Sequence, residues 1–143
     1  MSQISVSAPG KCILFGEHAV VYGQPAVAVA IDQRITVRLQ PSQTGTWLLD
    51  GNRLNMSRNP HISGLIQKLW PANMGAPPLS IHIQGNIPRS SGLGSSAALS
   101  VALAGALRLA RGRWVTKQNS SEPNDWAEGF GSQIVSTLSL IHI

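Results

Sequence analysis

The order strand, glycine-rich loop, helix between Ile81 and Leu109 constrains the fold of this 143-residue chain more than any other feature. Residues Ile81–Gln84 alternate apolar and polar side chains, which is the period of a half-buried strand. Pro88 lacks the backbone donor that a strand ladder requires, so the strand ends before it. The glycines and serines that follow therefore form a loop.

A helix is expected after this loop, because residues 97–109 are mostly small or aliphatic and have good helix propensity. We expect it to begin at Ser95 or Ser96. Gly112 is predicted to stop it, since glycine is common just past the end of a helix.

Anion binding is the chemistry that the loop favours. Gly92 and Gly94 let the backbone approach a ligand, and the first N–H groups of the helix point at it with the positive end of the helix dipole. An ordinary capped turn is the alternative. The pattern Gly-x-Gly-x-x-Ala over residues 92–97 also fits a dinucleotide fingerprint, but Lys117 stands about 20 residues on, where that fold carries an acid.

Three ionisable side chains lie close together near the amino terminus. Lys11, Glu17 and His18 fall within the otherwise largely apolar segment 8–23, which glycines punctuate. Charged side chains beside buried strands usually need partners or a function. Taken singly, Lys11 is equally well explained as a surface residue, and His18 is better explained as a structural histidine. Together, the three indicate a site.

These two segments resemble the GHMP kinase superfamily. Residues 8–23 are similar to the first motif of its mevalonate kinases, which the form Gly-Glu-His-Ala-Val-Val-Tyr-Gly over residues 16–23 favours, and residues 88–98 are similar to its phosphate loop. The resemblance covers residues 4–117. It implies an α+β fold similar to ribosomal protein S5 domain 2, with a left-handed β-α-β unit around the phosphate loop. The carboxy-terminal ferredoxin-like domain of the family is expected to be absent from this sequence.

The resemblance implies ATP and Mg²⁺ as cofactors and mevalonate as substrate. Lys11 matches a catalytic lysine near the transferred phosphoryl group and the substrate hydroxyl. Glu17 and His18 match residues of the mevalonate site, and Ser96 matches the serine that ligates magnesium. The nucleotide-binding positions that it implies are Pro88, Ser90, Ser91, Gly92, Leu93, Gly94, Ser95, Ser96 and Ala97.

The reaction that the resemblance implies is transfer of the γ-phosphoryl group of ATP to the 5-hydroxyl of (R)-mevalonate, in isoprenoid biosynthesis. The family uses a downstream glutamate as a magnesium ligand and a downstream aspartate as the base. Neither can be placed, because the acids after the loop helix are Glu122, Asp125 and Glu128 and none stands in a matching context. We therefore expect this sequence to be inactive alone. Another GHMP small-molecule kinase and a non-catalytic nucleotide-binding module are the alternatives.

Composition changes at Lys117. All 11 Lys and Arg residues lie at or before it, whereas residues 118–143 contain acids but no Lys or Arg. We predict that residues 1–117 are an incomplete amino-terminal ATP-binding domain of a longer kinase. Residues 118–143 are predicted to be an atypical tail, disordered or artefactual, and a divergent linker and strand is the alternative.

Several further elements are expected before the phosphate loop. Residues 26–31 are a near-continuous apolar run, and Ile35, Val37 and Leu39 alternate with polar residues so that they face inward. The elements expected in order are strands over residues 4–7, 12–15, 26–31 and 35–39, a hairpin over 47–55 turning at Asp50-Gly51-Asn52, a helix capped by Asn59 with Pro60 at its first position and ending before Pro71, and a strand over 79–85.

Composition also bounds the setting of the chain. Hydrophobic residues make up 43%, which is enough apolar material for one core. The single cysteine, Cys12, excludes an intrachain disulfide and favours a reduced compartment, so we expect a cytoplasmic location. The apolar runs are shorter than the roughly 20 residues that span a bilayer, so no membrane partner is expected.

A nucleic-acid binder is the remaining alternative, because the sequence pI is about 10.4 and the implied fold is S5-like. The arginines form no dense cluster except within residues 108–113, and aromatic residues for base stacking make up only 5% of the chain. No nucleic-acid partner is therefore expected. Family kinases are often dimers, which makes a homodimer an expectation for the full-length enzyme.

Overall fold

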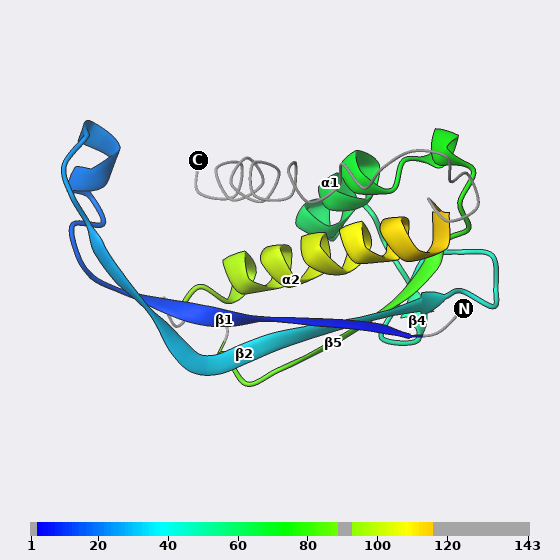
Figure 1. Cartoon of the computed structure of the whole chain (residues 1–143), viewed down its shortest axis with the longest axis horizontal. Helices are drawn as coiled ribbons and strands as arrows, with labels where there is room; N and C mark the ends of the chain where they lie inside the picture. The colour runs from blue at the N-terminus through cyan, green and yellow to red at the C-terminus, as the bar shows by residue number, and fades with distance from the viewer. Residues whose placement is uncertain (1–2, 89–92, 116–143) are drawn as a thin grey trace.

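The computed structural model describes residues 3–88 and 93–115. A five-stranded sheet in the order β1-β2-β5-β3-β4 carries helices α1 and α2 on one face (Figure 1). The fold is α+β, as expected. The elements are β1 (Ile4–Phe15), the 3-10 turn η1 (Ala19–Tyr22), β2 (Val27–Pro41), β3 (Leu48–Leu49), β4 (Asn52–Arg53), α1 (Pro60–Leu69), the 3-10 turn η2 (Ala72–Met74), β5 (Leu79–Gly85), α2 (Ser95–Ala110) and the π-helical turn η3 (Arg111–Val115).

The two longest strands replace the four that the sequence predicts. β1 and β2 pair antiparallel from Ile4 opposite Leu39 to Phe15 opposite Val27, with a register shift between Pro9 and Lys11. The predicted break after Ser7 is therefore wrong. β1 is the edge strand of the sheet, where a proline without an N–H group is tolerated, and the irregularity at Pro9 bends the strand without ending it.

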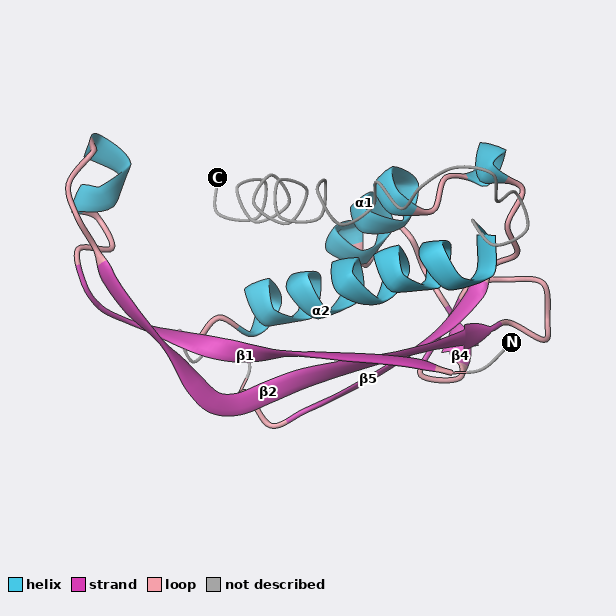
Figure 2. Ribbon diagram, in the orientation of Figure 1, coloured by secondary structure: helices cyan, strands magenta, loops and turns pink. Residues whose placement is uncertain are grey.

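The far part of the β1–β2 hairpin projects beyond α2 as an arm with η1 at its tip (Figure 2). The apolar run over residues 26–31 lies in this arm, and it is not core. Val27 is 39% exposed and Val29 is 44% exposed, because the arm extends past the helices that cover the rest of the sheet. An apolar run alone does not reveal how far the covering helices reach.

The short hairpin is confirmed. Leu48 pairs with Arg53 and Leu49 with Asn52, which leaves Asp50 and Gly51 as the two turn residues. Both have a positive φ, 49° and 84° respectively, as a type I′ turn requires. β3 then pairs parallel with β5, with Leu48 opposite Ser80.

Helix α1 has the predicted bounds and the predicted first residue, Pro60. Asn59 occupies the N-cap position, but its side chain makes no capping hydrogen bond. Its Nδ2 group instead donates to the carbonyl oxygen of Asn55 at 2.9 Å. The predicted side-chain cap is thus wrong, because the amide is oriented by its donor group toward the preceding loop and its oxygen accepts no N–H of the first helical turn.

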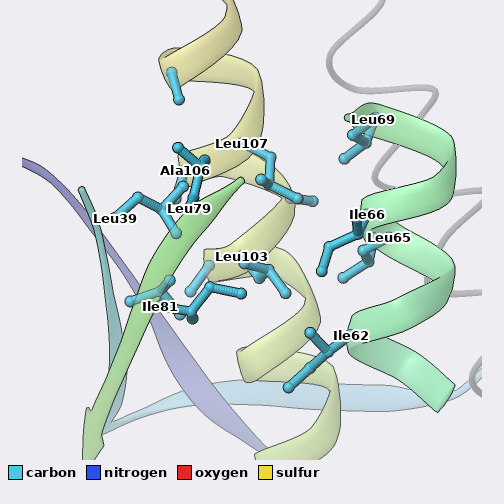
Figure 3. Packing of buried hydrophobic residues seen from close by; sticks show 14 of the residues in the cluster. Leu39, Ile62, Leu65, Ile66, Leu69, Leu79, Ile81, Leu103, Ala106 and Leu107 are labelled. Carbon is cyan, nitrogen blue, oxygen red and sulfur yellow. The ribbon is translucent and has the colours of Figure 1, made fainter. Parts of the chain in front are cut away.

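The hydrophobic core lies between the sheet and the two helices, with α2 against the sheet and α1 beside it (Figure 3). The inward positions predicted on β2 are confirmed, since Val37 and Leu39 are 0% exposed and Ile35 is 8% exposed. The largest of the fully or almost fully buried apolar side chains are Ile4, Val37, Leu39, Leu69, Leu79, Ile81, Leu103 and Leu107.

Helix α2 begins at Ser95, as predicted, but Gly112 does not stop it. The backbone passes from Ala110 into the π-helical turn Arg111–Val115 with Arg111 in the right-handed helical region. Gly112 is not among the glycines with a positive φ. A glycine ends a helix when it adopts the left-handed conformation, and its identity alone does not force that conformation.

Candidate nucleotide-binding site

The structure brings the amino-terminal motif and the phosphate loop into direct contact. The backbone N–H of Lys11 donates to the carbonyl oxygen of Leu93 at 2.8 Å. The neighbouring Gly10 has no room for a side chain, because a Cβ there would lie 2.7 Å from the Leu93 oxygen and 2.9 Å from Cδ1 of Ile87. Glycine at this position therefore lets β1 approach the loop closely enough for the hydrogen bond.

The Lys11 side chain lies on Gly94, the residue before α2. A Cβ at Gly94 would stand 2.8 Å from Cγ of Lys11, and Gly94 has a φ of 73°, which favours glycine. Its carbonyl oxygen accepts the hydrogen bond from Ala98 at 2.8 Å that opens the helix. Lys11 thus lies at the amino-terminal end of α2. Its role on phosphate, which the family resemblance implies, stays a prediction.

Two serines begin α2. The N–H groups of a first helical turn have no partner within the helix, so those of Ser95, Ser96 and Ala97 are available to an anion. Ser96 is exposed and Ser95 is half-buried, whereas the Ala97 side chain is buried. Ser95 and Ser96 can therefore offer hydroxyl groups to a ligand, and Ala97 only its backbone.

The central part of the phosphate loop lies outside the described residues. This applies to Ser90, Ser91 and Gly92 among the predicted nucleotide-binding positions. Of the flanking positions, Pro88 is exposed and Leu93 is half-buried. The predicted tail over residues 118–143 also lies outside the described part of the chain.

A cavity of about 500 Å³ adjoins the start of α2. Its wall combines the sheet face, the β3–β4 turn and the first residues of both helices. The lining residues are Ile35, Leu49, Asp50, Asn59, Ile62, Ile83, Gly85, Ile87, Ser95, Ser96 and Leu99. Pockets that bind small molecules and cofactors have volumes of about 300–1,000 Å³, and this cavity lies within that range. Its wall combines apolar side chains with a large share of polar surface.

Sequence reasoning missed Asp50 and Asn59 as part of this cavity. It assigned Asp50 to a turn and Asn59 to a helix cap, which are ordinary roles for these residue types. Asp50 reaches the cavity because β3 pairs in parallel with β5, the strand that leads into the phosphate loop, and Asn59 reaches it from the start of α1. A pairing between strands about 30 residues apart leaves no local signal in the sequence.

Glu17 and His18 lie elsewhere. They immediately precede η1 at the tip of the arm, away from α2 in Figure 1, with side chains 61% and 97% exposed. The only partner recorded for either is the other, at 3.7 Å between Nε2 of His18 and Oε1 of Glu17, within the described residues. The structure therefore brings Lys11 to the phosphate loop and leaves Glu17 and His18 on the arm.

Metal binding by protein side chains alone is not indicated in residues 3–88 and 93–115, which hold no group of three His, Cys, Asp or Glu residues. Ser96 still fits Mg²⁺ as one oxygen ligand, because this ion is often held by few protein groups together with substrate phosphates. In these same ranges, none of the helices is both long and apolar enough to cross a membrane. The cytoplasmic location and the homodimer stay predictions.

Comparison with known proteins identifies relatives of this chain. The family model described as GHMP kinases N terminal domain matches residues 61–130. The mevalonate kinase of Methanothermobacter thermautotrophicus is 45% identical over 112 residues, which cover 76% of this chain and 37% of that protein. Because the family match ends beyond Lys117, the predicted boundary at that residue stays a prediction.

Two crystal structures are similar as well. Methanococcus jannaschii mevalonate kinase matches with a TM-score of 0.62 and 26% identity, over 96% of this chain and 47% of that one. Mevalonate kinase from Staphylococcus aureus MRSA252 matches with a TM-score of 0.58 and 33% identity, over 91% and 46%. The chain thus spans between about a third and a half of the length of these relatives. It belongs to the GHMP kinase family and is similar to part of the mevalonate kinases.

Proposed function

We propose that the chain binds MgATP at the start of α2 and in the adjoining cavity, as the nucleotide-binding part of a mevalonate kinase. The reaction is transfer of the γ-phosphoryl group of ATP to the 5-hydroxyl of (R)-mevalonate, which gives 5-phosphomevalonate and ADP. The contact between Lys11 and Gly94 carries this proposal, because it joins the two kinase-like motifs at one helix terminus.

The phosphates occupy the amino-terminal end of α2. Backbone N–H groups and the positive end of the helix dipole attract the negative charge, and the hydroxyl groups of Ser95 and Ser96 add donors. The cavity begins at the same two serines and is large enough for the nucleoside. The phosphate-loop positions Ser90, Ser91 and Gly92 belong to this proposal through the family resemblance alone.

Lys11 is the proposed catalytic residue in this chain. Phosphoryl transfer depends mainly on positioning and on stabilising charge that develops in the transition state. An ammonium group held beside the phosphates by Gly94 supplies such charge and favours the alkoxide of the acceptor. Ser96 would hold Mg²⁺ through its hydroxyl group, and the ion would supply positive charge beside the phosphates. Glu17 and His18 are proposed to contact mevalonate.

A non-catalytic nucleotide-binding module is the second candidate. The carboxylates in the described residues are Glu17, Asp32 and Asp50, and Asp50 is the one that lines the cavity. It accepts a backbone hydrogen bond of the sheet rather than standing beside Lys11. Calorimetric titration with MgATP tests the binding that both candidates share, and saturation-transfer NMR with mevalonate in the presence of ADP separates them. Mevalonate binding supports the kinase part, whereas nucleotide binding without mevalonate binding supports the module.

Replacing Ser96 by alanine tests the proposed metal ligand. We expect Ser96→Ala to weaken MgATP about tenfold and to leave ATP in EDTA within twofold of the unchanged protein, because the hydroxyl acts through the ion. Isothermal titration with and without Mg²⁺ measures both affinities. Ser5→Ala, at an exposed position on β1, is the control and should change neither. Equal losses in both titrations contradict a role in metal binding.

Replacing Glu17 by glutamine tests whether the arm belongs to the nucleotide site. We expect Glu17→Gln to leave the MgATP dissociation constant within twofold, because Glu17 lies at the tip of the arm with its side chain 61% exposed. Mevalonate binding, followed by saturation-transfer NMR in the presence of ADP, should weaken. A tenfold change in MgATP affinity contradicts this division of the site.

A further inference from the structure

Asp50 is a cavity-lining carboxylate that the mechanism above does not use. Its backbone N–H donates to the carbonyl oxygen of Ile81 at 2.8 Å, and its Oδ1 accepts the N–H of Ile83 at 2.9 Å. Two hydrogen bonds to β5 thus fix both the backbone and the side chain. The carboxylate is consequently held at a defined place in the wall of the cavity.

The wall of the cavity includes both this carboxylate and the serines that begin α2. Asp50 is hydrogen-bonded to Ile83, and the residues that line the cavity continue from Ile83 to Ile87, toward the phosphate loop. Ile87 lies beside Gly10, and Gly10 lies beside Leu93, just before α2. An extended chain rises about 3.3 Å per residue, so Ile83 and Ile87 are separated by at most roughly 13 Å. A nucleoside triphosphate whose phosphates sit at α2 spans such a distance.

The carboxylate of Asp50 retains hydrogen-bonding capacity. An ionised carboxylate offers about four acceptor positions, and the bond from Ile83 uses one of them. The Nδ1 atom of His82 does not occupy any of the remaining acceptor positions, because it stands 4.0 Å from Oδ1 of Asp50, beyond hydrogen-bonding distance. The Asp50 side chain is 54% exposed, so a ligand in the cavity can reach it.

We propose that Asp50 recognises a hydrogen-bond donor of the nucleoside, either the amino group of the base or a ribose hydroxyl. This inference rests on the proposed nucleotide site and adds its specificity. Leu49, Ile62 and Ile83 supply apolar surface for the base, and Asp50 supplies a charged acceptor next to them. A site built around a hydrogen bond rejects analogues that lack the donor far more strongly than an apolar wall does.

Asp50→Asn is the variant that isolates this role. Asparagine is tolerated at positive φ, so the backbone at 49° is compatible with it. Its Oδ1 can still accept the N–H of Ile83, while the second acceptor oxygen becomes an amino donor. The variant therefore changes only the group offered to the ligand, from a hydrogen-bond acceptor to a hydrogen-bond donor. Asp32→Asn, at an exposed position on β2 outside the cavity wall, is the matched control for charge.

Calorimetric titrations of the full chain with the magnesium forms of ATP, ITP and 2′- and 3′-deoxy-ATP provide the test. We expect Asp50→Asn to weaken MgATP about tenfold, since a hydrogen bond to a charged group is lost. If the base amino group is the donor, the variant narrows the preference for ATP over ITP. If a ribose hydroxyl is the donor, ATP and ITP weaken equally and one deoxy analogue is insensitive to the variant. Either pattern supports the proposal.

Two results overturn it in distinguishable ways. MgATP affinity within twofold of the unchanged protein, or an equal loss for Asp32→Asn, removes Asp50 from nucleoside recognition and leaves the proposed nucleotide site intact. No MgATP binding by the unchanged chain removes the nucleotide site and the inference together. Circular dichroism melting of each variant, recorded alongside, must match the unchanged chain for an affinity loss to count as support.

Discussion

Leu103→Ala is expected to lower the free energy of unfolding by about 3 kcal/mol. Leu103 is 0% exposed on α2, and Figure 3 shows it between Ile81 of β5 and Ile62 of α1. Removing its terminal carbons loses their transfer free energy and leaves a cavity between three elements. These elements cannot all close on it, because each is held by its own hydrogen bonds. Urea unfolding followed by circular dichroism measures the change.

Leu109→Ala is the control for this measurement. It makes the same chemical change on the same helix, but Leu109 is only partly buried at the edge of the core. The loss should be smaller, about 1 kcal/mol, since part of the removed surface already meets solvent and the gap left at the edge of the core is open to water. Equal losses for Leu103→Ala and Leu109→Ala contradict the packing of α2 between the sheet and α1.

Much of the core was predictable from local patterns, and the reason is visible in α1. Pro60 and the apolar spacing of Ile62, Leu65 and Ile66 specify both the start and the buried face of that helix. The alternation along β2 specifies Val37 and Leu39 in the same way. These signals are local because the spacing of apolar residues that is typical of a helix or a strand repeats within a few residues.

The features that were not predictable depend on contacts between distant segments. Gly112 stays in a continuing helical backbone, although its residue type suggested an end. β1 continues through Pro9 because it lies at the edge of the sheet, and its place in the strand order is not encoded near Pro9. Asp50 reaches the cavity through the parallel pairing of β3 with β5. Each outcome was decided by a neighbour in space.

The candidate site shows the same division. The loop, the start of α2 and the importance of Lys11 followed from residues 8–23 and 88–98, and the structure joins them through the hydrogen bond from Lys11 to Leu93. The separation of Glu17 from this contact was not predictable, because β1 continues in extended conformation from Lys11 to Phe15 and carries it along the arm. Short spacing in the sequence does not imply proximity when the segment is a strand, since a strand rises about 3.3 Å per residue.

The second large effect is expected from Gly94→Ala, which should weaken MgATP binding at least about tenfold. A Cβ at Gly94 would stand 2.8 Å from Cγ of Lys11, so the lysine stem must leave its place on the loop. The stem is flexible, and its displacement moves the ammonium group rather than unfolding the chain. The expected loss therefore appears in affinity, measured by titration, at a temperature where the variant is folded.

Gly45→Ala separates this contact from backbone strain. Gly45 has a φ of 72°, against 73° at Gly94, but a Cβ there meets nothing within 4 Å. Both variants should lose about 1 kcal/mol of stability, because an L-residue in the left-handed region carries that cost. Only Gly94→Ala should lose MgATP affinity. If both variants bind MgATP like the unchanged chain, the position of Lys11 on Gly94 does not contribute to binding of the phosphates. The contact between Lys11 and Gly94 then no longer supports the proposed function.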